Sequence, residues 1–255
     1  MSAEGNTKTV KAVETTFGIV DVLTQIQSAG VSEIAAEVDI PVSTAYMHLN
    51  TLRQSGYVVK SDREYRLSLR FLEHGGAVRQ QMEFFTVIKD EINQLTYMTG
   101  EISGFAIEEL GQRVILYRSE GTGAVGDQIP IGEYTYMHWT SLGKAIMAHL
   151  PEARVDEIVD RHGLPAGTRY TITDRATLTD ELATIQSQGY AIDDAERRRG
   201  IRGVAVPVLD ADEGVVGSVG IAGPKARFDE DYIAELISVL LEKRNIIEIR
   251  NNFYY

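Results

Sequence analysis

Two short motifs in this 255-residue sequence have spellings that also occur in enzymes. Gly121, Gly123 and Gly126 match the GxGxxG pattern of a dinucleotide-binding loop, and they follow a predicted strand. The next residues, 127–130, end in a proline and do not start a helix, so no helix N-terminus is available for a pyrophosphate. We therefore interpret this stretch as a loop.

Ser141 and Lys144 form the second motif, because they match the SxxK pattern of penicillin-binding enzymes, in which the serine is a nucleophile. The partner motifs of that chemistry, SDN and KTG, do not occur in the sequence. Our preferred interpretation is a structural serine and lysine at the start of a helix, with no catalytic residue assigned. A serine- and lysine-dependent hydrolase-like enzyme stays as an alternative.

The sequence does not indicate metal or cofactor chemistry. His138, His149 and His162 lack the spacing of metal ligands relative to carboxylates, and cysteine is absent. We expect no metal site, no cofactor and no disulfide. The charged run 193–199 is interpreted as a solvent-exposed, salt-bridged turn.

Another group of side chains has the types that read double-stranded DNA. Asparagine binds adenine through two hydrogen bonds, serine and threonine bind several bases, and methionine or valine meets a thymine methyl group. The predicted contacts to base edges are Val42, Ser43, Thr44, Tyr46, Met47 and Asn50. The predicted phosphate contacts are Arg53, Lys60, Arg63 and Arg66.

Three predicted helices and a hairpin would position these side chains. Gly30 and Pro41 separate the helices, and a polar turn joins the strands of the hairpin. The predicted helices are 10–27, 31–38 and 43–55, and the predicted strands are 57–60 and 65–68. This order predicts a winged helix-turn-helix domain over residues 1–70.

After residue 70 the pattern changes to a long helix and then to mixed strands and helices. Helical spacing from Leu72 to Met98 predicts a linker helix over 71–83 that pairs with a copy of itself, and a continuation that packs on a sheet. The predicted strands are 102–109, 113–120, 190–193, 204–210 and 215–222, and the predicted helices are 141–149, 152–162, 176–187 and 229–252. The fold class is therefore α+β, with a second domain over 84–255.

The overall composition is typical of a globular protein. Hydrophobic residues make up 44 % of the sequence, which is enough to build a core. No run approaches the length of a transmembrane helix, and the N-terminus lacks the apolar segment of a signal peptide. We expect a soluble, cytoplasmic protein without membrane contact.

The net charge of −12 is unusual for a DNA-binding protein, but it is unevenly distributed. Residues 1–70 contain 7 Lys/Arg and 8 Asp/Glu, which leaves 18 and 29 of the totals of 25 and 37 for the rest of the chain. One interpretation is an ordinary solvated acidic surface. A sharper hypothesis is adaptation to a high internal salt concentration, at which counterion release contributes little to DNA affinity.

Four stretches, in their order and spacing, resemble the IclR family of transcriptional regulators. The stretch 40–58 resembles the family's recognition helix and the start of its wing. The stretches 132–145, 188–201 and 205–224 resemble segments of its C-terminal domain. Together they cover most of the chain.

This resemblance implies a winged helix-turn-helix domain, a linker helix and a GAF-like effector-binding domain. It implies dimers through the DNA-binding domain and linker, tetramers through the effector domains, and an effector such as an organic acid, an aromatic acid or a sugar-derived metabolite. The implied pocket residues are Tyr136, His138, Trp139, Leu142, Asp193, Ile201, Gly203, Gly220 and Ala222.

The sequence departs from the family pattern at several of these positions. Met47 stands where the family commonly has arginine, and Tyr136 replaces a usual proline. Leu142, Gly203 and Ala222 stand where small polar or thiol groups often bind a carboxylate, so we expect a more apolar pocket with fewer fixed donors. Three alternatives follow: a ligand other than a small keto acid, binding by backbone N–H groups, or no effector.

The preferred hypothesis is a sequence-specific regulator in which a metabolite shifts the population of effector-domain arrangements and so changes the spacing of two recognition helices. The alternatives are the hydrolase-like enzyme and a dimeric interaction module without an effector, whose winged helix binds protein.

Overall fold

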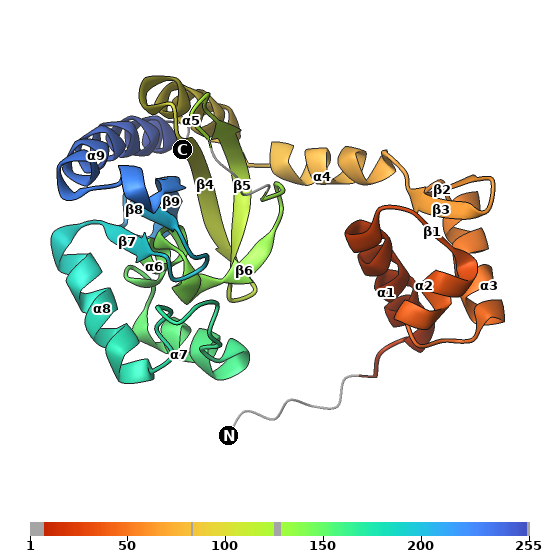
Figure 1. Cartoon of the computed structure of the whole chain (residues 1–255). Helices are drawn as coiled ribbons and strands as arrows, with labels where there is room; N and C mark the ends of the chain where they lie inside the picture. Colours follow the sequence, from red (N-terminus) through yellow and green to blue (C-terminus); the bar gives the residue numbers. More distant parts are fainter. Residues whose placement is uncertain (1–7, 83, 125–128, 254–255) are drawn as a thin grey trace. The chain divides into compact units, whose positions relative to one another are not determined.

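The computed structural model describes residues 8–82, 84–124 and 129–253 (Figure 1). The chain forms two compact units, one ending at Gln81 and the other beginning at Met82, and each has its own hydrophobic core. Within the described ranges, no helix combines the length and apolar character needed to cross a membrane.

The N-terminal unit consists of three helices and a small antiparallel sheet. The helices are α1 (Lys11–Ile26), α2 (Val31–Glu37) and α3 (Val42–Gln54), and the strands are β1 (Ala29–Gly30), β2 (Val58–Ser61) and β3 (Glu64–Leu67), in the order β1-β3-β2. The core collects apolar side chains from every helix and from the hairpin: Ile19, Leu23, Ala29, Ile34, Leu49, Leu52, Val58 and Tyr65. This is the predicted winged helix-turn-helix arrangement, and β1 is a strand that the sequence pattern did not indicate.

A tight turn joins α2 to α3. Asp39 adopts a positive φ of 53°, a conformation that aspartate tolerates better than most residues. Ile40 precedes Pro41, which disfavours continuation of a helix, and Pro41 itself is extended (ψ 142°) at the N-cap of α3. The small side chains Ala35 and Ala45 are buried, which lets the two helices approach closely.

Residues 70–99 form two helices, α4 (Arg70–Gln80) and α5 (Phe85–Thr99). The prediction of one continuous helical segment from Leu72 to Met98 is therefore wrong, because α4 ends at Gln80 and α5 begins at Phe85. Met82 and Phe84 pack against the core of the C-terminal unit, whereas no residue of α4, which is described along its whole length, is buried. The chain turns where its apolar side chains begin to dock on the sheet.

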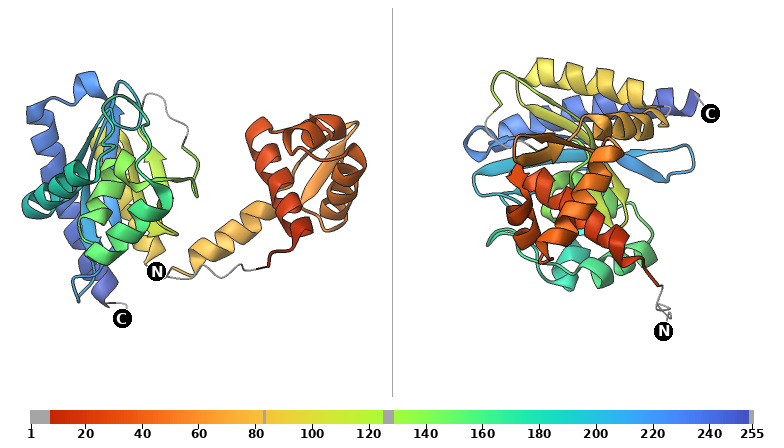
Figure 2. Two further views of the ribbon diagram at one scale, coloured as in Figure 1. Left: turned by 90° about the horizontal axis from the view of Figure 1, so that it is seen from below. Right: turned by 90° about the vertical axis from the view of Figure 1, so that its right-hand side faces the viewer.

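The C-terminal unit is a six-stranded antiparallel sheet with helices on both faces (Figure 2). The strands are β4 (Ile102–Glu109), β5 (Gln112–Glu120), β6 (Tyr134–Tyr136), β7 (Ala191–Asp194), β8 (Ile201–Leu209) and β9 (Val215–Pro224), in the order β6-β5-β4-β9-β8-β7. One face carries α5 and α9 (Glu230–Phe253). The other carries η1 (Met137–Trp139), α6 (Ser141–Met147), α7 (Glu152–His162) and α8 (Arg175–Gln188), and η2 (Lys225–Arg227) follows β9.

Alternation along β8 lets one sheet serve two cores. Val204, Val206 and Val208 join the core with α5 and α9, whereas Ala205 joins the core with α6 and α8, because successive side chains of a strand point to opposite faces. On the second face α6 lies very close to η1. A Cβ atom on Gly143 would lie 2.1 Å from the carbonyl oxygen of Met137, so only glycine fits there.

The predicted strands and helices of this unit end within three residues of the observed ones. The sequence pattern did not indicate the short helices η1 and η2, nor the strand β6. It has three residues and pairs with β5 at the edge of the sheet, so it is too short to show a recognisable alternation.

Candidate functional site

The helix α3 presents a polar and aromatic face opposite its buried stripe. Ala45, Leu49 and Leu52 are buried in the core. The side chains predicted to contact bases lie on the other positions: Val42, Ser43, Tyr46 and Met47 are exposed, and Thr44 and Asn50 are half-buried. Met47 is 61 % exposed, so an apolar side chain stands at the centre of this face.

Cationic side chains flank α3 at its end and on the hairpin. Arg53, Lys60, Arg63 and Arg66 are all exposed. Lys60 Nζ lies 5.1 Å from the ring centroid of Tyr65, which is buried below the hairpin. These positions suit contacts to phosphates on either side of a helix in a groove.

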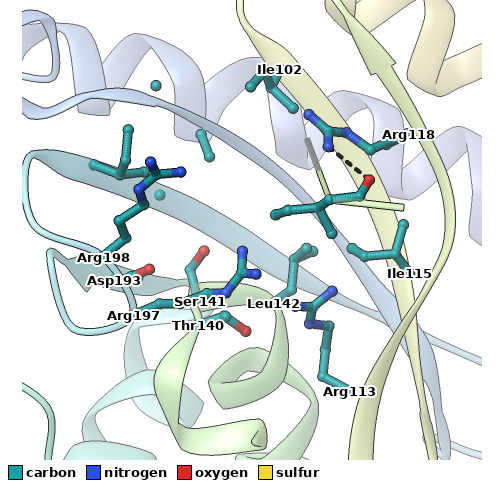
Figure 3. A pocket seen from close by; sticks show the side chains of 15 residues that line it. Ile102, Arg113, Ile115, Arg118, Thr140, Ser141, Leu142, Asp193, Arg197 and Arg198 are labelled. Carbon is teal, nitrogen blue, oxygen red and sulfur yellow. Dashed lines mark hydrogen bonds between the residues drawn. The ribbon is translucent and has the colours of Figure 1, made fainter. Parts of the chain in front are cut away.

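A cavity of about 80 Å³ lies in the C-terminal unit between the sheet and the start of α6 (Figure 3). Its floor is a row of directly paired residues on four adjacent strands: Asp193 pairs with Gly203, Gly203 with Ala222, and Ala222 with Ile102. The remaining walls come from β5, the N-terminus of α6 and the turn after β7. The lining residues are Ile102, Arg113, Ile115, Arg118, Ile129, Thr140, Ser141, Leu142, Asp193, Arg197, Arg198, Ile201, Gly203, Ala222 and Gly223.

The start of α6 is fixed against this floor. Thr140 caps the helix by accepting a hydrogen bond from the Gly143 N–H at 3.0 Å. A Cβ atom on Gly203 would lie 2.9 Å from Ser141 Oγ, so the glycine leaves room for the serine. Ser218 on β9 donates a hydrogen bond to the carbonyl oxygen of Leu142 at 2.9 Å.

Five of the nine implied pocket residues line the cavity, and four do not. Those that line it are Leu142, Asp193, Ile201, Gly203 and Ala222. Tyr136, His138 and Trp139 form an aromatic cluster outside the lining, where the rings of His138 and Trp139 each hydrogen-bond the carbonyl oxygen of Pro165. Gly220 lies under Leu142 and Ala205, each of which would be within 3.0 Å of an added Cβ.

Much of the pocket wall is apolar, in line with the expectation, but arginine side chains add hydrogen-bond donors that the sequence pattern did not indicate. Four arginines line the cavity, and the family resemblance implied none of them. Arg113 and Arg118 come from β5, and Arg197 and Arg198 come from the turn after β7. The prediction that the run 193–199 is solvent-exposed is wrong for Asp193 and Glu196, which are buried, and right for Arg198 and Arg199. Arg197 is half-buried and bonds Glu133 at 3.1 Å.

A β-bulge explains why two arginines of β5 reach the same cavity. Ile115 pairs with Ala106 and Tyr117 with Phe105, so Leu116 is left between two pairs. The extra residue shifts the alternation by one, which brings Arg118 to the cavity together with Arg113 and Ile115. A strict period of two would have turned Arg118 away.

A cluster of buried charges lies behind the cavity. The Lys144 ammonium donates to Glu196 Oε1 at 2.6 Å and to Glu181 Oε1 at 2.9 Å. Asp193 Oδ1 accepts a hydrogen bond from the Glu196 N–H at 2.7 Å. Burial, and secondly the nearby Glu196 charge, raises the pKa of Asp193 to about 7.

This cluster leaves the SxxK motif without an available base. Lys144 is 1 % exposed and already donates to two carboxylates, and Ser141 is also buried. Among the described residues, no group of three or more His, Cys, Asp or Glu side chains could hold a metal ion.

The whole chain is similar to known transcriptional regulators. Residues 12–62 match the IclR helix-turn-helix domain, and residues 76–247 match the model described as bacterial transcriptional regulator IclR C-terminal. A probable HTH-type transcriptional regulator ArcR of Halobacterium salinarum is 28 % identical over 251 residues, covering 96 % of this chain and 95 % of that protein. The HTH-type transcriptional regulator KdgR of Escherichia coli is 26 % identical and covers 91 % and 89 %, respectively.

Solved structures agree with both units. The Thermotoga maritima IclR structure has a TM-score of 0.79 at 29 % identity and covers 94 % of this chain and 98 % of that chain. An IclR homologue of Microbacterium hydrocarbonoxydans, solved with 4-hydroxybenzoate, shares the fold (TM-score 0.80, 20 % identity, 93 % and 98 % covered). The chain therefore belongs to the IclR family of transcriptional regulators, with a helix-turn-helix DNA-binding domain followed by the family's effector domain.

Proposed function

We propose that this regulator acts as a self-associated, ligand-responsive DNA-binding protein, in which an effector in the C-terminal cavity changes the spacing of two recognition helices. The observation that carries the proposal is the cavity, because it opens between the sheet and the start of α6 in the unit that matches the effector domain. Winged helices that bind as dimers need half-sites about one helical turn apart, or a multiple of it. A shift in spacing therefore alters operator affinity.

The face of α3 supports the DNA half of the proposal. Asn50 and Met47 lie away from the buried stripe, in positions to meet base edges, and the basic side chains of the hairpin lie beside them. The N-terminal 70 residues carry almost no net charge. Base contacts and dimer geometry thus supply more of the specific affinity than charge does.

Helix α4 supports self-association. Leu72 and Val78 are 71 % and 60 % exposed, and α1 adds the exposed Phe17. Large exposed apolar side chains on a helix between two units are typical of a surface that pairs with another chain. We assign α4 and α1 to a dimer interface and the effector domains to a further contact in a tetramer.

The cavity supports a small effector, an organic acid or a sugar-derived metabolite. Its apolar residues suit the carbon skeleton of such a ligand, and its polar side chains suit the acidic or hydroxyl groups. A fold neighbour was solved with 4-hydroxybenzoate, an aromatic acid. The effector would bind one arrangement of the effector domains more tightly than the other, because a ligand with equal affinity for both does not change their populations.

A mobility-shift assay tests the DNA half, with the DNA directly upstream of the chain's own coding sequence and scrambled DNA as the control. Specific binding is expected at both low and high salt. Absence of specific binding at both salt concentrations would favour an interaction module over a regulator. A thermal-shift screen of metabolites, followed by the same assay with each stabilising compound, tests the effector half.

The enzyme alternative makes a different prediction. A serine activated by lysine reacts with acylating probes. Because Lys144 is paired with Glu181 and Glu196, we expect no labelling of Ser141. Stoichiometric labelling of the wild type that is lost in Ser141→Ala would support the hydrolase-like alternative.

A further inference from the structure

Arg113 is an unusual residue for the wall of a ligand cavity. Its side chain is 1 % exposed, yet it lines the cavity, and its guanidinium points toward the start of α6 beside Leu142 (Figure 3). Burial is the largest cause that lowers the pKa of Arg113, to about 10, and the neighbouring Arg197 charge is the second. The guanidinium is still charged at neutral pH, although burial of a charged group is energetically unfavourable.

The hydrogen bonds of Arg113 are incomplete. Nη2 donates to Glu133 Oε2 at 3.1 Å, but Nε and Nη1 have no acceptor among the described residues. A buried donor without an acceptor costs free energy, and the cost is greater for a charged group. Arg113 shares the Glu133 carboxylate with a second arginine, because Glu133 also accepts hydrogen bonds from Arg197.

The surroundings of Arg113 are also positive. Arg118 and Arg197, both of which line the same cavity, repel its charge, and Glu133 provides the attraction. In a chain with a net charge of −12, this concentration of guanidinium groups around one buried cavity stands out from the acidic background. An acceptor with a negative charge would satisfy both the unused donors and the positive potential.

We infer that Arg113 is the specificity-determining residue of the cavity and binds an anionic group of the effector, a carboxylate or a phosphate, on the β5 wall. The inference rests on the proposed effector function, which already includes an acid among the ligands, and adds the residue that binds the anionic group and makes its charge a requirement. It places the anion against a strand side chain on the β5 side of α6, across from the Asp193 end of the floor. Because Nε and Nη1 are themselves buried, the inference requires that the Arg113 or Leu142 side chain rotates when the anion binds.

Matched probes test the charge requirement without knowledge of the natural effector. Succinate and succinamide have similar shapes and differ in charge, and inorganic phosphate is compared with chloride at equal ionic strength. Binding to the full chain is followed by thermal shift and by the fluorescence of Trp139, the single tryptophan. The variants are Arg113→Met, which removes the charge, and Arg113→Lys, which keeps it with fewer donors. Arg199→Gln is the control, because Arg199 is exposed on the same turn and lines a separate surface pocket with Arg169 and Lys225.

The wild type and Arg199→Gln should bind succinate about 10- to 100-fold more tightly than succinamide, the range of one charge-assisted hydrogen bond. Arg113→Met should lose this preference and the response to phosphate, while its melting temperature without ligand stays at or above that of the wild type. Arg113→Lys should retain part of the preference. An anion response that Arg113→Met retains, one that Arg199→Gln abolishes, or a wild type that no anion stabilises would overturn the inference. These measurements use no DNA, so they stand apart from a failure of operator binding, which would contradict the regulator proposal alone.

Discussion

Lys144 Nζ lies 2.6 Å from Glu196 Oε1, and both side chains are buried. The pair joins α6 to the turn after β7, and both of these elements line the cavity of the C-terminal unit. Its position means that the residue resembling a catalytic lysine is part of the support for the cavity. Movement of the turn cannot occur without separating this pair or moving α6 with it.

Replacement of Lys144 by methionine should lower the free energy of unfolding by about 3–5 kcal/mol, because removal of one partner leaves a buried carboxylate without its counterion. Urea unfolding followed by circular dichroism measures the loss. The double variant Lys144→Met with Glu196→Gln is the control, since it removes the stranded charge. The double variant should be more stable than the single one, and equal losses would show that the ion pair is not the cause.

The elements of the fold could be predicted from the sequence because the signals are local. Gly30 and Pro41 separate the helices of the N-terminal unit, and alternating apolar residues mark the long strands. The sequence does not indicate the break after α4, because Val78, Met82 and Phe85 continue a helical spacing across it. What ends the helix is docking on a distant sheet, which local periodicity does not contain.

Only part of the pocket could be predicted, because its residues come from distant parts of the chain. Asp193, Gly203 and Ala222 were placed by resemblance, and they meet because of strand register. Arg113 carries a local signal in the sequence, since it is a charged residue two positions before Ile115 and therefore on the same face of a predicted strand. Arg118 has none, because the bulge at Leu116 sets its direction.

Asn50 and Lys60 should have different roles on DNA. If Asn50 reads a base, Asn50→Ala relaxes the sequence preference and costs about 1–3 kcal/mol on the specific site. If Lys60 meets a phosphate, Lys60→Ala weakens all DNA about equally and reduces the salt slope by about 1. Fluorescence anisotropy with the operator and with single-base variants separates the two. Unchanged specificity in Asn50→Ala would mean that α3 meets the groove in another register.

Leu72 should contribute to the dimer contact. The substitution Leu72→Asp should raise the dissociation constant of the dimer about 100-fold. Each of the two protomers loses roughly 1.5 kcal/mol of stabilisation from apolar burial. Light scattering after size exclusion measures the association, and operator binding should fall with it. Leu110→Asp is the matched control: Leu110 is 59 % exposed in the C-terminal unit and should leave the dimer intact. If the Leu72→Asp variant still forms the dimer with unchanged affinity, Leu72 is not part of the dimer interface.

Asp193 should make the stability of the C-terminal unit depend on pH. Its pKa is raised to about 7 in the folded chain from an ordinary value near 3.8, chiefly by burial. Between these two values the folded state binds more protons than the unfolded state. Stability contributed by the protonated carboxyl is therefore complete below about pH 4 and is lost as the pH rises through about 7.

The variant Asp193→Asn isolates this effect, because the amide oxygen can still accept the hydrogen bond from the Glu196 N–H. Relative to the wild type, Asp193→Asn should gain stability on going from pH 4 to pH 8, by an amount on the order of 2–4 kcal/mol. Chemical denaturation at several pH values measures the difference. Asp194→Asn is the comparison, since ion pairs with Arg202 and Lys225 lower the pKa of that carboxyl. This second variant should instead lose stability relative to the wild type above about pH 4, so two adjacent aspartates are expected to give pH profiles of opposite sign.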